Sequence, residues 1–394
     1  MAAKYNLTII PNTLATFGGG EHLAFEMANK LKGSCNVRIV NPVSSIDMIR
    51  TEKGKLLKEH GIKESQVVDV ECKGMRMKAF GTEDFILMVP TMNGKHRLAE
   101  TIKKSDSVYC ITNNPFIVDY AAKVSNKYNT KFVFAIQNRI FASYFEKSRS
   151  LKDIMGTAMY RRILRKIKYF HALNSFDANL VKRNLPKAIA YTIPGFTSLK
   201  KPRVSTNSGR FVALWVGRLP EYQKGVDLLC DVIKRTVEKD KDIEFRIVGA
   251  GGDGEHLVKS ISKTHKDNVS WLGFVPYDKV KRQYSDSDLL LFTARGDELR
   301  YFPLVFLEGQ SFGLPIVAFD GNSHEEIVDS TSGKLIKAFD TGKFSDAVIE
   351  YHRLWVRDRK RYLKLKARIS DITMDRYSEE AVIPKMARML IPDN

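Results

Sequence analysis

The chain has 394 residues, more than one hydrophobic core ordinarily serves, so its length predicts two domains. Hydrophobic residues make up 43% of it, which excludes a disordered chain, and no apolar run reaches the ~18 residues that a membrane-spanning helix needs. A formal net charge of +19 favours anionic lipid headgroups or phosphorylated substrates as partners, or else a merely soluble, lysine-rich surface, and the lack of a nucleic-acid-binding motif predicts no nucleic-acid partner.

The first half of the sequence alternates apolar, β-prone runs with segments of helical spacing, which predicts an α/β fold. The expected strands are Tyr5–Ile10, Val37–Val40, Phe85–Val89, Ser107–Thr112, Lys131–Ile136, Phe170–Leu173 and Ala188–Ile193. The expected helices are Glu21–Leu31, Ser44–His60, His96–Lys103, Ile117–Lys127, Met155–Tyr169 and a helix from its cap Ser175 to Asn184. The first strand follows no signal-peptide segment, so we expect the protein in the cytoplasm.

Four cysteines are scattered along the chain without CxxC spacing, namely Cys35, Cys72, Cys110 and Cys230. Buried free thiols in a reducing cytoplasm are the simplest interpretation of this pattern. A metal site or a disulfide framework is the alternative.

Two positions in the first half have the character of ligand loops. Gly18–Gly20 separates the first strand from a helix, where Gly19 and Gly20 allow close backbone approach and expose N–H groups. Gln137 and Asn138 directly follow a buried strand, and sites in parallel sheets are built at such strand ends. A plain turn or loop explains either position equally well.

The segment Met155–Tyr169 contains no acidic residue. Helical spacing places its apolar residues Met159, Ile163, Leu164 and Ile167 on one face, and the other faces carry Arg161, Arg162, Arg165, Lys166 and Lys168. A basic amphipathic helix of this kind can lie on an anionic membrane surface. The alternative is an ordinary surface helix that packs its apolar face on the sheet.

Residues 197–209 are rich in Ser, Thr, Lys, Pro and Gly and are the best linker candidate. We therefore expect an N-terminal domain at 1–200, a second domain at 201–372, and a helical segment at 373–394 that packs back on the first domain. In the second half the expected strands are Phe211–Val216, Glu244–Val248, Val269–Leu272, Leu289–Phe292 and Ile316–Phe319, with a helix at Val226–Glu238.

Four polar constellations follow strands of the second half. Arg218 and Lys224 stand between the first strand and a helix, where two cations and a helix dipole make a candidate diphosphate site. The loop Gly249–Gly254 allows close backbone approach, and Gly273–Pro276 can present backbone groups to a base. Glu308 falls inside a helix and can accept a pair of sugar hydroxyls. For each of these groups taken singly, a surface ion pair is the alternative interpretation. Their order along the chain makes it unlikely that all four occur together by chance.

Several short motifs occur in the order Val216-Gly217-Arg218, Lys224–Leu229, Val248–Gly251, Phe302–Val305 with Glu308, and Gly313-Leu314-Pro315. Together they resemble those of family-4 retaining glycosyltransferases of the GT-B type. The resemblance is strong over Phe211–Gly333 and weaker over the first half, where it rests on Gly18–Glu21 and the order of strands and helices. It implies two Rossmann-like domains that face each other across a deep cleft.

The resemblance also implies roles for individual residues. A nucleotide-diphosphate sugar, UDP- or GDP-linked, would bind mainly to the second domain and an acceptor mainly to the first. No metal or other cofactor is implied, because Arg218 and Lys224 would stabilise the leaving diphosphate. Glu308 matches the second Glu of the family's Glu-x7-Glu motif, which grips the ribose. The other implied donor contacts are Gly19, Gly20, Gly217, Gly251, Phe274, Val275, Glu298, Arg300, Tyr301, Phe302, Pro303 and Leu304, and Gln137 and Asn138 would touch the acceptor or the sugar.

The sequence departs from the family pattern at two places. Arg300 occupies the position of the family's first Glu, which Glu298 or Asp297 can replace if the loop bulges. As a cation near the donor sugar, Arg300 can pair with an acidic group on the sugar or with an acceptor phosphate. The alternative is that it points to solvent or pairs with Asp297. Gln137 and Asn138 stand where many members carry a His, and an amide forms hydrogen bonds but shuttles no proton.

We therefore expect a cytoplasmic, retaining glycosyltransferase of the hexosyltransferase type. It would act on a glycan or lipid-linked acceptor at the inner face of the cell membrane, held there by the basic segment. A soluble polysaccharide synthase and a sugar-nucleotide epimerase share the architecture and stay open as alternatives. So does a catalytically silent sugar-nucleotide-binding protein, which the missing Glu and His would permit.

Overall fold

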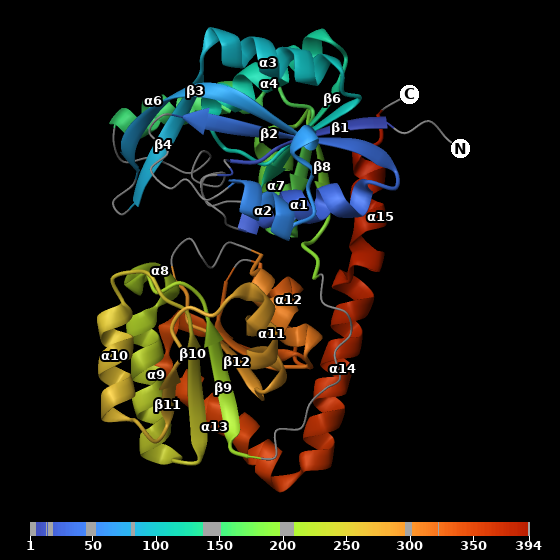
Figure 1. Ribbon diagram of the computed structural model, residues 1–394. Helices are drawn as coiled ribbons and strands as arrows, with labels where there is room; N and C mark the ends of the chain where they lie inside the picture. The colour runs from blue at the N-terminus through green and yellow to red at the C-terminus, as the bar shows by residue number, and fades with distance from the viewer. Residues whose placement is uncertain are drawn as a thin grey trace. The chain divides into compact units, whose positions relative to one another are not determined.

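The computed structural model describes residues 5–12, 14, 19–44, 53–79, 83–136, 151–197, 209–295, 302–321 and 323–392. They form two compact units, one of Met1–Ile193 with Ile383–Asn394, the other of Pro194–Val382. Each unit is built on its own sheet of mainly parallel strands, with helices packed on it (Figure 1). The expected α/β class with two Rossmann-like sheets is thereby confirmed.

The first unit contains an eight-stranded sheet of order β4-β3-β2-β1-β5-β6-β7-β8. Its strands are β1 (Tyr5–Ile10), β2 (Cys35–Ser44), β3 (Val67–Ala79), β4 (Glu83–Pro90), β5 (Ser107–Cys110), β6 (Lys131–Ile136), β7 (Tyr169–Ala172) and β8 (Ile189–Thr192). Only the β3–β4 pair is antiparallel among these strands. Every residue of β5, β6 and β7 is buried, which explains why these strands are mostly apolar in the sequence.

The helices of the first unit are α1 (Gly19–Leu31), α2 (Lys53–Glu59), α3 (Met92–Lys103), α4 (Pro115–Lys127), α6 (Leu151–Leu164) and α7 (Ser175–Asn184). One hydrophobic core joins α3, α4, α6 and α7 to the sheet through Leu98, Ile117, Leu164 and Val181. Cys72 and Cys110 lie in that core, and all four cysteines are buried free thiols.

Three expectations for the first unit are wrong in part. The expected helix Ser44–His60 is wrong at its start, because Ser44 pairs with β3 as the last residue of β2; α2 forms part of the rest, and residues 45–52 lie outside the described residues. The expected helix Met155–Tyr169 ends at Leu164, and Tyr169 begins β7. Ser175 is the first residue of α7, and the cap is Asn174, whose side chain accepts a 2.8 Å hydrogen bond from the Asp177 N–H.

The second unit contains a six-stranded parallel sheet of order β11-β10-β9-β12-β13-β14. Its strands are β9 (Phe211–Val216), β10 (Ile243–Val248), β11 (Val269–Trp271), β12 (Leu289–Phe292), β13 (Ile316–Phe319) and β14 (Gly333–Ile336). Counted along the chain, this order is third, second, first, fourth, fifth, sixth, the order of dinucleotide-binding Rossmann sheets. It reverses between β9 and β12, and ligands bind such sheets outside the carboxyl ends of the strands at this reversal.

The helices of the second unit are α8 (Glu221–Lys224), α9 (Val226–Lys239), α10 (Glu255–Thr264), α11 (Tyr277–Ser285), α12 (Leu304–Ser311), α13 (Thr341–Arg357) and α14 (Arg359–Tyr377). Phe211, Phe245 and Leu291 of the sheet pack with Leu229 of α9 and Val348 of α13 in the main core. The last helix, α15 (Glu379–Leu390), ends in the first unit, where Ser107 Oγ donates to the Leu390 carbonyl (2.5 Å) and Lys131 Nζ to that of Ile391 (2.9 Å).

Candidate functional site

Lys224 lies at the reversal of strand order in the second unit. It ends α8, Gly225 alone separates it from α9, and hydrogen bonds fix its backbone to the residue that follows the neighbouring strand β12. Trp215 Nε1 donates to Thr293 Oγ1 (3.1 Å), and Thr293 Oγ1 donates to the Lys224 carbonyl oxygen (2.9 Å). The Lys224 ammonium lies 5.8 Å from the centre of the Phe292 ring. The cation is therefore held where the chains leaving β9 and β12 meet.

The residue after Lys224 explains how closely these chains approach. Gly225 has a φ of +60°, and a Cβ added there would lie 2.0 Å from the Thr293 carbonyl oxygen. Glycine is required at this position for both reasons. The glycine that follows Lys224 in the sequence is therefore required by the backbone conformation, whatever its role in binding.

Arg218 lies two residues after β9 and is exposed. No ion pair or hydrogen bond holds its guanidinium among the described residues. An exposed guanidinium can bind a phosphate with two hydrogen bonds.

The glycine loop after β10 packs directly on the loop after β9. Leu219 N donates to the Gly251 carbonyl and Gly254 N to the Leu219 carbonyl, each at 2.9 Å. A Cβ on Gly249 would lie 1.7 Å from the Gly217 carbonyl oxygen. The glycines of this loop do allow close backbone approach, but the group approached is the backbone of the loop after β9. The Gly251 N–H donates to the Glu255 carboxylate, so a phosphate there would have to replace that carboxylate.

The loop after β11 continues this series of connected loops. Gly249 N donates to the Gly273 carbonyl oxygen (2.8 Å), and Trp271 Nε1 donates to the Gly249 carbonyl oxygen (2.9 Å). Phe274 is a large apolar side chain that is 78% exposed, and Val275 is half-buried. An exposed ring beside backbone groups suits the face of a nucleobase.

Glu308 is the fifth residue of α12, which begins directly after Pro303. It is half-buried, and its carboxylate accepts a hydrogen bond of 2.7 Å from the Tyr284 hydroxyl of α11. Phe302 is buried at the start of the same helix. The sequence pattern identified Glu308 but not Tyr284.

A second unpredicted contact lies beside Lys224. Arg295, three residues after β12, forms a 2.5 Å ion pair with Asp227 of α9 and lies over the Tyr222 ring at 5.4 Å. Its N–H also donates to the Gln223 carbonyl oxygen (3.1 Å). The Arg295–Asp227 pair was not predicted because the two residues are 68 positions apart in the sequence.

His324 is the titratable side chain packed beneath this region, against Phe292 and Phe306 at ring distances of 5.5 and 5.1 Å. Its Nδ1 lies 2.9 Å from the Phe319 carbonyl oxygen, so Nδ1 carries a proton that it donates. Burial lowers the pKa of His324 to about 4. A neutral, fully buried imidazole belongs to the core and is no proton shuttle.

Several predicted site residues lie outside the described part of the chain: Gln137, Asn138, Asp297, Glu298, Arg300 and Tyr301. Gly19 and Gly20 are the first two residues of α1, so their N–H groups open a helix of the first unit. Within the described ranges, no three His, Cys, Asp or Glu side chains gather as metal ligands.

The basic segment of the first unit has a buried apolar side. Ile163, Leu164 and Ile167 are at most 6% exposed and pack in the core, while Met159 is 44% exposed. Among the cations, Arg162, Arg165, Lys166 and Lys168 are exposed, and Lys166 pairs with Asp119 at 2.9 Å. The segment thus packs its apolar face on the sheet, as expected of an ordinary surface helix. The side chains that it exposes are mainly the charged ones. No described helix is long and apolar enough to cross a membrane.

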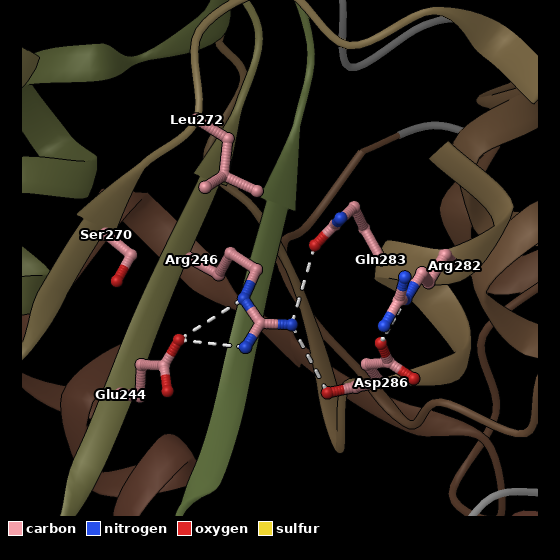
Figure 2. A pocket seen from close by; sticks show the side chains of 7 residues that line it. All are labelled: Glu244, Arg246, Ser270, Leu272, Arg282, Gln283 and Asp286. Carbon is pink, nitrogen blue, oxygen red and sulfur yellow. Dashed lines mark hydrogen bonds and ion pairs between the residues drawn. The ribbon is translucent and has the colours of Figure 1, made fainter. Parts of the chain in front are cut away.

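A cavity of about 380 Å³ lies beside β10 and α11 (Figure 2). Arg246 points into it and pairs with Glu244 at 2.9 Å, and Arg282 pairs with Asp286 at 3.3 Å. Both lining cations are therefore matched by carboxylates. None of the predicted donor-binding residues lines this cavity, so it is distinct from the site at the strand ends.

Comparison with known proteins identifies the domain that carries these strand ends. Residues 210–353 match the family model described as Glycosyl transferases group 1, and the second unit therefore contains a glycosyltransferase group 1 domain. A GDP-mannose-dependent monoacylated alpha-(1-6)-phosphatidylinositol monomannoside mannosyltransferase of Corynebacterium glutamicum is 26% identical over 132 residues, which are 32% of this chain and 34% of the relative. The chain matches about a third of the length of such curated relatives.

Solved structures resemble the whole chain. HepE of Anabaena in complex with UDP has a TM-score of 0.72 at 14% identity, over 98% of this chain and 99% of that one. A mutant of S. aureus TarM, in complex with fondaparinux, alpha-GlcNAc-glycerol and UDP, has a TM-score of 0.71 at 13% identity, over the same shares. At such identities the likeness shows the fold, which is that of the GT-B glycosyltransferases.

Proposed function

We propose that the protein is a retaining glycosyltransferase that moves a sugar from a UDP- or GDP-linked donor to a glycan or lipid-linked acceptor, without a metal ion. The supporting observation is the convergence of Arg218, Lys224, the Gly249–Gly254 loop and Glu308 on the carboxyl ends of neighbouring strands in a group 1 glycosyltransferase domain. UDP and a GDP-mannose donor are named for proteins that resemble this chain.

In the proposed chemistry, positive side chains lie where negative charge develops on the leaving group. As the sugar leaves, negative charge grows on the donor's diphosphate, and the ammonium of Lys224 and the guanidinium of Arg218 would stabilise it. The backbone of Lys224 is held by the hydrogen bond from Thr293 Oγ1 to its carbonyl oxygen, which places the base of this side chain at the strand ends before any ligand binds. In a retaining transfer without a protein nucleophile, the leaving phosphate takes the acceptor's proton, so no protein base is required.

We further propose that the cations at 161–168 hold the protein on anionic headgroups near a lipid-linked acceptor. Because the apolar side of this segment is buried, the attraction would be electrostatic and would weaken with salt. This part of the proposal is independent of the donor site.

Release of UDP or GDP from a panel of UDP- and GDP-sugars, measured with lipid-linked and soluble glycan acceptors, tests the proposal. We expect release with one donor and an α-linked product from an α-linked donor. Nucleotide binding without turnover on any donor would favour a catalytically silent binding protein, and turnover confined to soluble glycans would favour a polysaccharide synthase.

A further inference from the structure

We propose that the outer face of α14, with the adjoining end of α13, binds the chain of an acidic polysaccharide. This α14 surface consists of six exposed cations, two at the end of α13 and four on α14: Arg353, Arg357, Lys360, Arg361, Lys364 and Arg368. Binding of a polyanion here is independent of the donor site. The choice of a glycan as that polyanion rests on the function proposed above.

Contacts on the inner side of α14 fix which of its side chains face outward. Tyr362, Lys366 and Ser370 are at most 1% exposed, and each donates to a backbone carbonyl oxygen of the same unit, at 2.7, 2.8 and 2.6 Å. A second row at 360, 364 and 368 repeats with the same period, two residues earlier. Two residues turn a helix by about 200°, so this row points away from the unit, at whose edge α14 lies (Figure 1).

The charge of the α14 surface is not neutralised by the described part of the chain. Within that part, no ion pair or side-chain hydrogen bond involves any of the six cations. Asp358 is the single acidic residue between positions 351 and 370, and its carboxylate caps the helix by accepting the Arg361 backbone N–H at 2.9 Å. By contrast, the exposed Arg235 of α9 pairs with Asp231 at 2.7 Å.

The placement of these charges opposes the stability of the helix itself. The amino terminus of a helix carries a partial positive charge that favours carboxylates, yet the first turn of α14 contains Arg359, Lys360 and Arg361 and no acid. Lys360 and Lys364 are like charges one turn apart, as are Lys364 and Arg368, and such pairs repel. Charges that are unfavourable in the protein alone are expected where a partner of opposite charge binds.

The shape of the surface favours a linear polyanion over a membrane. The four cations of α14 follow one helix over about 12 Å, and neighbours in the row at 360, 364 and 368 are about 6 Å apart. Such a single file, with roughly one sugar unit between charges, matches a chain that carries a charge at regular intervals. Val356 is the single large apolar side chain exposed between positions 351 and 370, so little apolar area is available to enter a bilayer.

The aromatic side chains beside the α14 surface are not free to stack on nucleobases. Trp355 is half-buried, and the Arg359 guanidinium lies 4.0 Å from its ring centre. Tyr351 and Tyr362 are buried. Single-stranded nucleic acid is bound through exposed rings as well as cations. Among linear polyanions an acidic polysaccharide therefore fits best, and for a glycosyltransferase it would be a charged glycan acceptor or product.

The test is fluorescence anisotropy of a labelled polygalacturonate oligomer titrated with the full chain at low and high salt, with neutral dextran as the blank. Wild type should bind polygalacturonate and not dextran, and its affinity should fall steeply as salt is raised. The double variants Lys360→Glu/Arg361→Glu and Lys364→Glu/Arg368→Glu should each weaken binding at least about tenfold, because each reverses two contacts to the polymer.

A matched control reverses the same amount of charge elsewhere in this unit. Lys259→Glu/Lys263→Glu changes two exposed lysines of α10 and should weaken binding by less than about twofold. Carboxylates favour a helix amino terminus, so Lys360→Glu/Arg361→Glu should also keep or raise the urea midpoint of unfolding. Lost binding with full stability distinguishes a binding surface from a structural one.

Three results would overturn the inference. The first is no binding of polygalacturonate by wild type. The second is an equal loss in the α10 control, which indicates attraction by the overall charge alone. The third is that both α14 variants lose binding to phosphatidylglycerol vesicles or to oligothymidylate while they keep binding to polygalacturonate. The proposed function fails in a different measurement, the release of UDP or GDP, because the reversed residues lie outside the donor site.

Discussion

The two units carry their important positive charge in opposite ways. In the second, Lys224 and Arg295 are held by named partners: Thr293 fixes the lysine backbone, and Asp227 with Tyr222 fixes the arginine. In the first, the cations at 161–168 lie mostly exposed at the surface, in sequence next to a buried apolar stripe. We therefore expect single substitutions of these cations to change catalysis in the second unit, whereas membrane binding through the first unit should depend on the summed charge.

The largest effect is expected at the leaving-group site. Lys224→Ala should lower kcat about 10²–10³-fold, because it removes a cation from the departing diphosphate. Steady-state kinetics with the identified donor measure this loss. Lys234→Ala, an exposed lysine farther along α9, is the control and should keep wild-type kinetics. Equal kinetics for Lys224→Ala and Lys234→Ala would contradict a catalytic role for Lys224.

A smaller but sizeable effect is expected in stability at Gly225. Gly225→Ala combines a φ of +60° with a Cβ 2.0 Å from a carbonyl oxygen, and it should lower the free energy of unfolding by about 3 kcal/mol or more. Gly251→Ala has a φ of +79° but nothing within 4 Å of the added Cβ, so about 1 kcal/mol is expected. Urea unfolding compares the two, and similar losses would show that the contact with Thr293 is not tight.

The sequence predicts the motif residues and most of the secondary structure, but it does not predict the side-chain contacts that support the site. Glu308, Lys224 and Gly225 were found because they sit in short motifs at strand ends. Strand β3 was missed because charged residues interrupt it, and the end of α6 because its helical spacing continued past Leu164. Tyr284, Thr293 and Asp227 support the site through bonds across 24, 69 and 68 residues, and a single sequence contains no signal for such pairings.

One buried histidine in each unit should make stability fall in acid by a similar amount. Burial lowers the pKa of both His171 and His324 to about 4, against 6.5 when exposed. The folded state therefore binds fewer protons than the unfolded state between these values, so stability is full above about pH 6.5 and lost as the pH falls toward 4. Each histidine should contribute about 2 kcal/mol of loss by about pH 4.5.

His171→Gln and His324→Gln test this in urea unfolding at about pH 7 and about pH 4.5. Each variant is less stable at neutral pH but should lose less than wild type on acidification, because the substituted side chain does not titrate. The same acid loss in wild type and variants would mean that neither histidine is held neutral by its fold.

The smallest effect per residue is expected at the basic segment. Each cation near an anionic surface contributes about 1 kcal/mol, so Arg165→Glu alone should weaken binding to anionic vesicles only modestly, and Arg161, Arg162 and Arg165 changed together should weaken it strongly. Vesicle flotation at low and high salt measures both. Binding that ignores salt, or no binding by wild type, would contradict membrane attachment through these charges.

Hydrogen–deuterium exchange of the full chain with and without UDP or GDP tests the central claim most directly, since it shows where a nucleotide binds. The account predicts slower exchange in Gly217–Gly225, Gly249–Glu255 and Leu304–Glu308. Protection that avoids these three segments, or no protection by either nucleotide at saturating concentration, would contradict a donor site at the strand ends of the second unit.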